Sequence, residues 1–158
     1  MASHRSGPLR AYRIADGRRP ILDGSGAALN GGRWNSPGRR LIYAADTYAG
    51  ALLEKLVHTN IGRIPASQAS IEILIPEDVG IEEVTPADLP GWDAEDQQVS
   101  REYGDAWHDQ QRTAVLVAPS VVTPVERNIV INPDHPDFAK LRASAPKPVR
   151  WDARLFGR

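Results

Sequence analysis

Three polar residues of different chemical kinds occur within a short stretch of the chain: Arg33, Tyr43 and Glu54. Arg33 follows two glycines, which allow a sharp turn and a close approach of the backbone to a ligand. A guanidinium in such a turn suits phosphate oxygens, because its planar fork can donate two parallel hydrogen bonds. A dinucleotide needs a cation for its diphosphate, an aromatic face for a base and a carboxylate for a sugar. The stretch therefore favours a dinucleotide site.

Each of these residues also has an ordinary structural interpretation, which the sequence alone leaves open. Arg33 could form a salt bridge with a surface acid. Tyr43 could pack in the core with its hydroxyl at the rim, and Glu54 could face water. Glu54 could also pair with Glu72 or Glu77 for glycoside hydrolysis, although the sequence does not give the separation of the carboxylates.

Hydroxyl and amide side chains provide further candidates in the second half of the chain. Ser120 directly follows an apolar run, where its hydroxyl could reach a cleft or shape a turn. It does not lie in a Gly-x-Ser-x-Gly elbow and no histidine is placed as its base, so a serine hydrolase is not favoured. Asn128 and Asn132 flank another extended run, and either could contact a ligand.

The composition excludes several classes of function. A formal net charge of −1 gives no basic footprint for nucleic acid. The chain has no cysteine, and its 4 histidines lack the spacing of metal ligands, so neither a thiol nucleophile nor a metal site is expected. No apolar run approaches the ~20 residues of a membrane span, and no signal peptide is visible. We expect a cytoplasmic protein.

The elements that must position these residues are expected to be short. Residues 15–32 have no periodicity and are expected to form a loop. Glu54 lies at the border of the apolar face of a helix that we expect to begin after an Asp46 cap. The expected strands are residues 9–14, 41–44, 70–75, 81–84 and 114–117, with 121–131 mostly extended. The expected helices are residues 46–60, 93–111 and 137–143.

Strands outnumber helices in this interpretation, and the helices do not alternate regularly with them. That pattern favours an α+β fold rather than a doubly wound sheet. The length of 158 residues and the lack of a linker or repeat predict a single domain over residues 1–158.

The chain resembles the RES-domain toxins of bacterial toxin–antitoxin modules. The blocks occur in the order found in that family and cover nearly the whole chain. They are Tyr12-Arg13-Ile14, Gly31-Gly32-Arg33-Trp34-Asn35-Ser36-Pro37-Gly38, Ile42-Tyr43-Ala44, Ala51-Leu52-Leu53-Glu54, Gly104-Asp105-Ala106-Trp107, Val117-Ala118-Pro119-Ser120-Val121-Val122, and the run from Asn128 to Pro133 followed by His135-Pro136-Asp137-Phe138.

The resemblance implies a fold similar to that of ADP-ribosyltransferases of the diphtheria-toxin type. Members of the family consume NAD: some look like NAD hydrolases or phosphorylases, and others transfer ADP-ribose to a host protein. A cognate antitoxin, usually with an Xre-like helix-turn-helix part, blocks the active site. The toxin chain itself is not expected to contact nucleic acid or membrane, and a homodimer within the complex is one option.

The resemblance also assigns roles to individual residues. Glu54 would stabilise the positive charge that develops on the ribose when the nicotinamide bond breaks. Arg33 would hold the diphosphate, and Tyr43 would stack on or orient the nicotinamide ring. Ser120 would hydrogen-bond the ribose or a phosphate, and Arg13 would be a second anionic anchor or simply structural. Asn132 completes the NAD-binding candidates, and no metal is required.

Two other functions remain open at this point. The enzyme could stop at hydrolysis or phosphorolysis of NAD and so only deplete it. The chain could also be an inactive module that holds a partner protein, although such a module need not retain Arg33, Tyr43, Glu54 and Ser120. The tryptophans at 34, 92 and 151 could serve a dimer, an antitoxin or the core.

Overall fold

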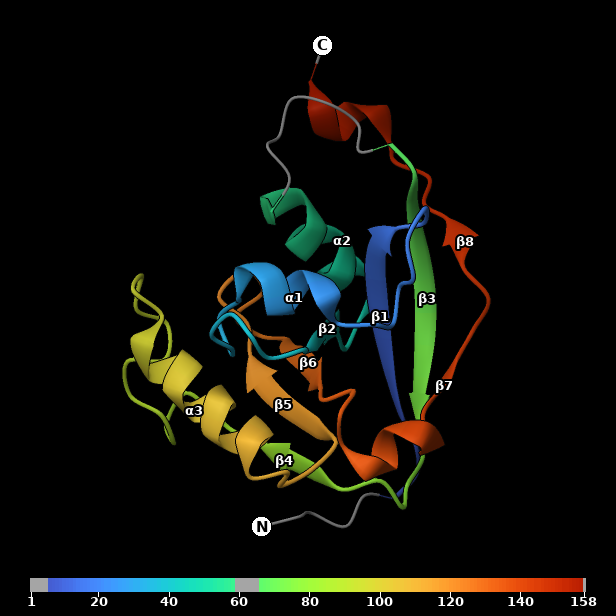
Figure 1. The fold of residues 1–158 in the computed structure, drawn as a ribbon. Coiled ribbons are helices and arrows are strands. Elements are labelled where there is room, and N and C mark those ends of the chain that lie inside the picture. Colours follow the sequence, from blue (N-terminus) through green and yellow to red (C-terminus); the bar gives the residue numbers. More distant parts are fainter. Residues whose placement is uncertain (1–5, 59–65, 158) are drawn as a thin grey trace.

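The structure is a computed structural model that describes residues 6–58 and 66–157 (Figure 1). The described chain is mixed α and β, with one curled sheet and few helices. The strands are β1 Leu9–Asp16, β2 Ile42–Ala45, β3 Gln68–Ile75, β4 Ile81–Glu83, β5 Val115–Pro119, β6 Arg127–Ile131, β7 Arg142–Ala143 and β8 Lys147–Pro148. The helices are α1 Ser25–Asn30, α2 Tyr48–His58 and α3 Gln98–Asp109, with 3₁₀ helices at Pro136–Lys140 and Ala153–Phe156.

The strands form a sheet in the order β4-β5-β6-β2-β1-β3-β7, and β8 also pairs with β3. Neighbouring strands are antiparallel except for β4 and β5. β1 pairs with β3 along its whole length of 8 residues, whereas β1 and β2 share only the pair Tyr12–Ala45. The sheet thus divides at this pair into two halves, which Figure 1 shows running in different directions.

Buried apolar side chains cover both faces of the sheet. Because side chains alternate along a strand, Val130 lies on the opposite face from Ile129 and Ile131. The largest cluster lies on the face of Ile129 and includes Ala11, Ile42, Ile71, Ile73, Ile75, Val115, Val117, Ile129 and Ile131. The Val130 face packs against α3 through Trp34, Leu41, Trp107, Leu116 and Val130, and against α2 through Ile14, Ala45 and Ala51.

The tryptophans are mostly core residues. Trp34 and Trp92 are buried and stack with their ring centroids 6.4 Å apart. Trp151 is only partly buried and meets Phe156 edge-on at 6.0 Å. Of the three tryptophans considered for a partner surface, Trp34 and Trp92 therefore belong to the core.

The expectation of a loop over residues 15–32 is wrong in its second half, where α1 forms. Asp23 fixes the start of α1, because its carboxylate accepts hydrogen bonds from both the backbone N–H and the hydroxyl of Ser25. Gly31 follows the helix with a φ of 71°, which glycine adopts without strain. A helix of 6 residues is too short to show a helical period in its sequence.

The expected cap of α2 is also wrong, because Thr47 rather than Asp46 begins the helix. The Thr47 hydroxyl accepts from the backbone N–H of Gly50 at 2.9 Å and donates to Glu126 at 2.7 Å. Asp46 instead accepts from the Arg127 side chain and backbone, which joins β2 to β6. The expected end of this helix at residue 60 lies outside the described residues.

Three other boundaries differ from the expected ones. α3 begins at Gln98, after turns at residues 93–97. The extended run expected over 121–131 is a turn followed by β6, which covers only Arg127–Ile131. The helix expected over 137–143 is the 3₁₀ helix Pro136–Lys140, because His135 accepts a capping hydrogen bond from the backbone of Asp137 and the chain then joins the sheet as β7.

Candidate active site

Glu54 lies on α2 and points to the end of β5, where Ser120 donates a hydrogen bond to it. The Ser120 Oγ to Glu54 Oε1 distance is 2.8 Å, and Ser120 is itself buried. Asn128 of β6 also lies against the carboxylate and lowers its pKa. On the solvent side, His58 Nε2 lies 3.6 Å from Glu54 Oε2. Ser120, directly after β5, and Asn128 of β6 thus hold the carboxylate of α2.

The surroundings of Glu54 keep it ionised. Burial disfavours its charge, but hydrogen bonds from His58, Ser120 and Asn128 outweigh burial and hold the pKa below its usual value. The carboxylate side chain retains 21% exposure. The result is a fixed negative charge at the edge of the core that a ligand can still reach.

Arg33 lies in a closed turn beside this face of the sheet. The backbone N–H of Gly32 donates to the carbonyl of Asn35 at 3.0 Å, which closes the turn. Arg33 Nη1 donates to the carbonyls of Trp92 and Ala94 at 3.1 and 3.2 Å. No carboxylate pairs with Arg33 among the described residues, so its charge is available to an anion.

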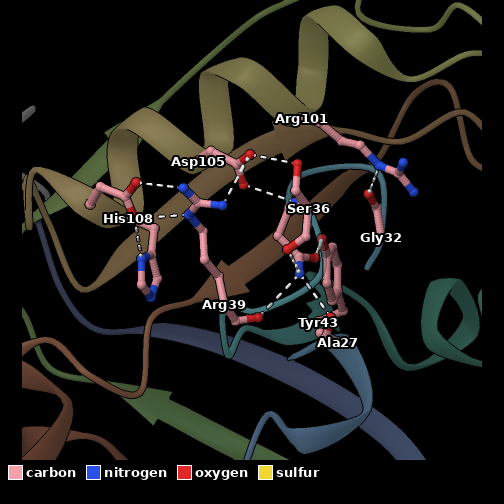
Figure 2. A network of polar contacts seen from close by, with 10 residues as sticks. Ala27, Gly32, Ser36, Arg39, Tyr43, Arg101, Asp105 and His108 are labelled. Carbon is pink, nitrogen blue, oxygen red and sulfur yellow. Dashed lines mark hydrogen bonds and ion pairs between the residues drawn. The ribbon is translucent and has the colours of Figure 1, made fainter. Parts of the chain in front are cut away.

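Tyr43 holds the same turn from the sheet. Its hydroxyl donates to Asn35 Oδ1 at 2.6 Å and accepts from the backbone N–H of Trp34 at 3.0 Å. Burial raises the pKa of the phenol above its ordinary value, so the hydroxyl stays protonated. A Cβ on Gly32 would lie 2.6 Å from this hydroxyl, which explains the glycine before Arg33. Figure 2 shows Tyr43 beneath the turn within the surrounding polar network.

The outer side of the turn is fixed to α3. Ser36 binds Asp105 through its backbone N–H and its hydroxyl, at 2.9 and 2.6 Å. Arg101 Nε donates to the carbonyl of Gly32 at 2.8 Å (Figure 2). Gly104 packs so tightly on Trp34 that an added Cβ would lie 1.8 Å from the Trp34 carbonyl oxygen. The turn that carries Arg33 is therefore clamped between β2 and α3.

The sheet register places Tyr43, which holds the Arg33 turn, near Asn128, which lies against Glu54. Tyr43 pairs with Val130, and Ala45 pairs with Asn128, two residues along the same strand and on the same face. Two strand residues span about 6.6 Å. Tyr43, which holds the Arg33 turn, and Asn128, which lies against Glu54, are thus on the same face of the sheet.

Arg13 and Asn132 are held elsewhere. Arg13 donates to the carbonyls of Ile21 and Tyr43 at 2.7 and 2.8 Å, across the gap where β1 and β2 diverge. Burial lowers the pKa of Arg13. Asn132 follows the opposite end of β6 from Asn128, and its Oδ1 accepts from the backbone N–H of Asp134. Both side chains fasten backbone segments, and neither lies in the Glu54 cluster.

Sequence reasoning missed His58 and Arg101. His58 had a local signal, since residues four apart on a helix are neighbours and a histidine follows Glu54 at that spacing. Arg101 had none, because its contact with Gly32 joins segments 69 positions apart.

A cavity of about 350 Å³ lies away from these residues, on the opposite face of the sheet. It is lined by Ile21, Leu22, Ile71, Ser144 and their neighbours. Its lining is mostly apolar and brings no carboxylate, so the polar cluster around Glu54 is the stronger candidate for chemistry.

The described residues contain neither a metal-binding cluster nor a membrane-spanning helix. No group of three or more histidine, aspartate and glutamate side chains there is arranged to hold a metal ion. None of the helices in that part of the chain is both long and apolar enough to cross a bilayer.

Comparison with known proteins identifies related chains. A "Prs ADP-ribosylating toxin" of Sphingobium sp. (strain YBL2) is 44% identical over 139 residues, covering 85% of this chain and 86% of the relative. A "Toxin Res" of Pseudomonas putida is 34% identical over 139 residues, covering 85% and 92%. The fold is similar to a chain in the crystal structure of the M. tuberculosis MbcT–MbcA toxin–antitoxin complex, with a TM-score of 0.72, 18% identity and coverage of 89% and 83%. The RES domain model matches residues 10–152, and the protein belongs to the RES domain family.

Proposed function

We propose that this protein is the toxin of a toxin–antitoxin pair, an enzyme that cleaves the nicotinamide–ribose bond of NAD and transfers ADP-ribose to an acceptor. Family membership and the printed names of the relatives, "Prs ADP-ribosylating toxin" and "Toxin Res", support this assignment. The similarity to a chain of a toxin–antitoxin complex supports the fold. We also propose that the divided sheet is that of a diphtheria-toxin-type ADP-ribosyltransferase, in one domain.

The ionised, hydrogen-bonded Glu54 is the observation that carries the proposal. Breaking the bond between the ribose anomeric carbon and the nicotinamide nitrogen leaves the electron pair on nicotinamide and positive charge on the sugar. A carboxylate fixed beside the sugar stabilises that charge without having to reorganise. An acceptor oxygen or nitrogen then bonds to the anomeric carbon and gives up its proton.

The other residues have supporting parts in this scheme. Arg33 holds the diphosphate, and Ser120 orients Glu54 and contacts the ribose beside it. Tyr43 keeps the Arg33 turn in place, with its ring edge towards the nicotinamide. Arg13 and Asn132 act from further away by fixing the strands on which the site rests.

The acceptor is proposed to be a side chain of another protein. The relative with 44% identity is named as a toxin that ADP-ribosylates Prs, which favours a protein over water or phosphate. A cognate antitoxin is proposed to cover the Glu54 face and so block access of NAD.

The first test replaces the charge of Glu54 and keeps its shape. Purified wild-type protein should release nicotinamide from NAD, and Glu54→Gln should lower that rate roughly 10²- to 10³-fold, because an amide cannot stabilise the cationic sugar. The measurement is nicotinamide release followed by chromatography, with circular dichroism to confirm folding. The matched control is Glu77→Gln, an exposed glutamate outside the site, which should leave the rate unchanged. A Glu54→Gln protein as fast as wild type would refute the role.

The second test identifies the acceptor. NAD labelled on the adenylate phosphate is incubated with cell extract, and the products are separated by electrophoresis. A labelled protein band is the expected result. Label found only in free ADP-ribose would instead show a hydrolase, and ADP-ribose 1″-phosphate formed only with added phosphate would show a phosphorylase.

A further inference from the structure

A second guanidinium, that of Arg101, lies at the turn that carries Arg33. Arg101 belongs to the first turn of α3, and its Nε donates to the carbonyl of Gly32, the residue before Arg33. Figure 2 shows the side chain reaching from the helix to Gly32 with its outer nitrogens beyond this hydrogen bond. They point away from the contacts between Arg39 and Asp105. Only Nε of Arg101 is thus occupied by the turn.

The charges of Arg33 and Arg101 both act on the Tyr43 hydroxyl. Burial raises the pKa of the Tyr43 phenol, the Arg101 and Arg33 charges lower it, and the Asp105 charge raises it. Within the described residues neither guanidinium forms an ion pair with a carboxylate. The acids of α3 have other partners: Asp105 and Asp109 bind Arg39, and Glu102 accepts a hydrogen bond from Gln98.

Two guanidiniums without a counter-ion at one turn favour binding of an anion. An anion bound at the turn can gain a charge-assisted contact from each guanidinium. Arg33 uses Nη1 for the carbonyls of Trp92 and Ala94 and keeps Nε and Nη2. Arg101 keeps both Nη1 and Nη2.

We propose that Arg101 is a second anchor for the diphosphate of the dinucleotide, acting with Arg33 from the α3 side of the turn. This inference rests on the proposed function, since it assigns one more contact of the same substrate. It also sets specificity, because a ligand without the diphosphate gains nothing from Arg101.

α3 holds Arg101 rigidly enough for this residue to act as an anchor. Gly104 lies three residues further along α3 and is pressed against the Trp34 backbone, so the helix cannot shift relative to the turn. A preorganised guanidinium loses little freedom when the ligand arrives, which is how a fixed charge contributes to affinity.

The test compares ligands that differ only in the diphosphate part. Wild-type protein, Arg101→Gln and Arg101→Lys are titrated with ADP-ribose and with adenosine by calorimetry. The glutamine amide can still donate to Gly32, but it carries no charge. We expect Arg101→Gln to weaken ADP-ribose binding at least about tenfold and to leave adenosine binding unchanged. Arg101→Lys should weaken ADP-ribose less, because it keeps the charge but not the fork.

Kinetics give a readout that a purely structural role would not produce. Arg101→Gln should raise the KM for NAD with little change in kcat, because the diphosphate contact is equally strong before and during bond cleavage. Arg142→Gln, an exposed arginine on β7, changes the net charge by the same amount and should behave as wild type.

Several outcomes would overturn the inference. Unchanged ADP-ribose affinity in Arg101→Gln would remove Arg101 from the site, while nicotinamide release by the wild type would leave the proposed function intact. Equal losses of ADP-ribose and adenosine binding in either variant would show a disturbed turn rather than a lost anchor. A wild-type protein that binds neither NAD nor ADP-ribose would refute the proposed function itself.

Discussion

At the scale of single residues, the Tyr43 hydroxyl joins two neighbouring groups of the turn that carries Arg33. It donates to Asn35 and accepts from the Trp34 backbone. Stacking on nicotinamide would need only the ring of Tyr43, whereas holding the Arg33 turn in place needs its hydroxyl. The two roles can therefore be separated by removing one oxygen atom.

Tyr43→Phe keeps the ring and removes both hydrogen bonds. The Asn35 oxygen and the Trp34 N–H are then buried without partners, so we expect a loss of about 1–3 kcal/mol in the free energy of unfolding. The KM for NAD should rise, because Arg33 is less well held. Denaturant unfolding and initial rates check both effects, with Tyr48→Phe, an exposed tyrosine, as the control. A variant of wild-type stability that has lost activity would instead place the hydroxyl on the ligand.

His58 gives the Glu54 cluster a pH dependence. The hydrogen bond and charge of Glu54 raise the pKa of His58 against the opposing effect of burial, while the pKa of Glu54 is lowered. The His58 contribution to stability is complete below its unfolded pKa of 6.5 and is lost as the pH rises through the higher folded value. The Glu54 contribution is complete above its unfolded pKa of 4.5 and is lost as the pH falls through the lower folded value. The pair therefore stabilises the fold most between these pH values.

His58→Gln should lower the melting temperature near pH 5.5 and have little effect near pH 8.5. The His58 side chain is 74% exposed, so solvent screens the pair. The difference should be small, about 0.5 kcal/mol or 1–2 °C. Thermal unfolding of both proteins at the two pH values measures it. A larger effect at pH 8.5 than at pH 5.5 would contradict the assignment of the pair.

At the scale of elements, the close approach of α3 to the Arg33 turn depends on one missing side chain. Replacing a glycine inside a helix by alanine normally raises the free energy of unfolding by about 1 kcal/mol. At Gly104 the added Cβ would meet backbone rather than a movable side chain. The normal gain should therefore reverse, since either the helix or the turn must move.

Gly104→Ala should destabilise the protein by about 2 kcal/mol or more and raise the KM for NAD as Arg101 and the turn separate. Gly26→Ala in α1 is the matched control, because open space surrounds that position. It should be neutral or stabilising, by up to about 1 kcal/mol. Equilibrium denaturation of both variants and wild type measures these changes in the free energy of unfolding. Equal stability of Gly104→Ala and wild type would mean that α3 is free to slide.

Local sequence patterns predicted those elements whose form depends on their own residues. The alternation of Ile71, Ile73 and Ile75 is confirmed as the buried face of β3, and the apolar run after Ala114 as β5. The sequence favours Asp46 as the cap of α2, because local residues do not distinguish it from Thr47. Arg127, far along the chain, binds Asp46 and leaves Thr47 to cap the helix. The predicted ends of helices and strands are wrong where contacts with residues far along the chain decide where the element begins or ends.

At the scale of the whole molecule, the division of the sheet could not be read from the sequence. β1 lies between β2 and β3, and only Tyr12 meets Ala45 across the join. Strand pairing of this kind depends on contacts between residues far apart in the chain, and local periodicity carries no information about it. The resemblance to a family predicts the fold, whereas the register that brings Asn128 beside Glu54 is seen only in the structure.

The contacts around Glu54 can form only after a late stage of synthesis of the chain. Glu54 is synthesised long before Ser120 and Asn128, the residues after β5 and in β6 that hold its carboxylate. A nascent chain on the ribosome therefore carries the acid without its partners until most of the polypeptide has emerged. Translation of a truncated message that ends before Ser120 would yield a chain in which this carboxylate is never assembled into its cluster.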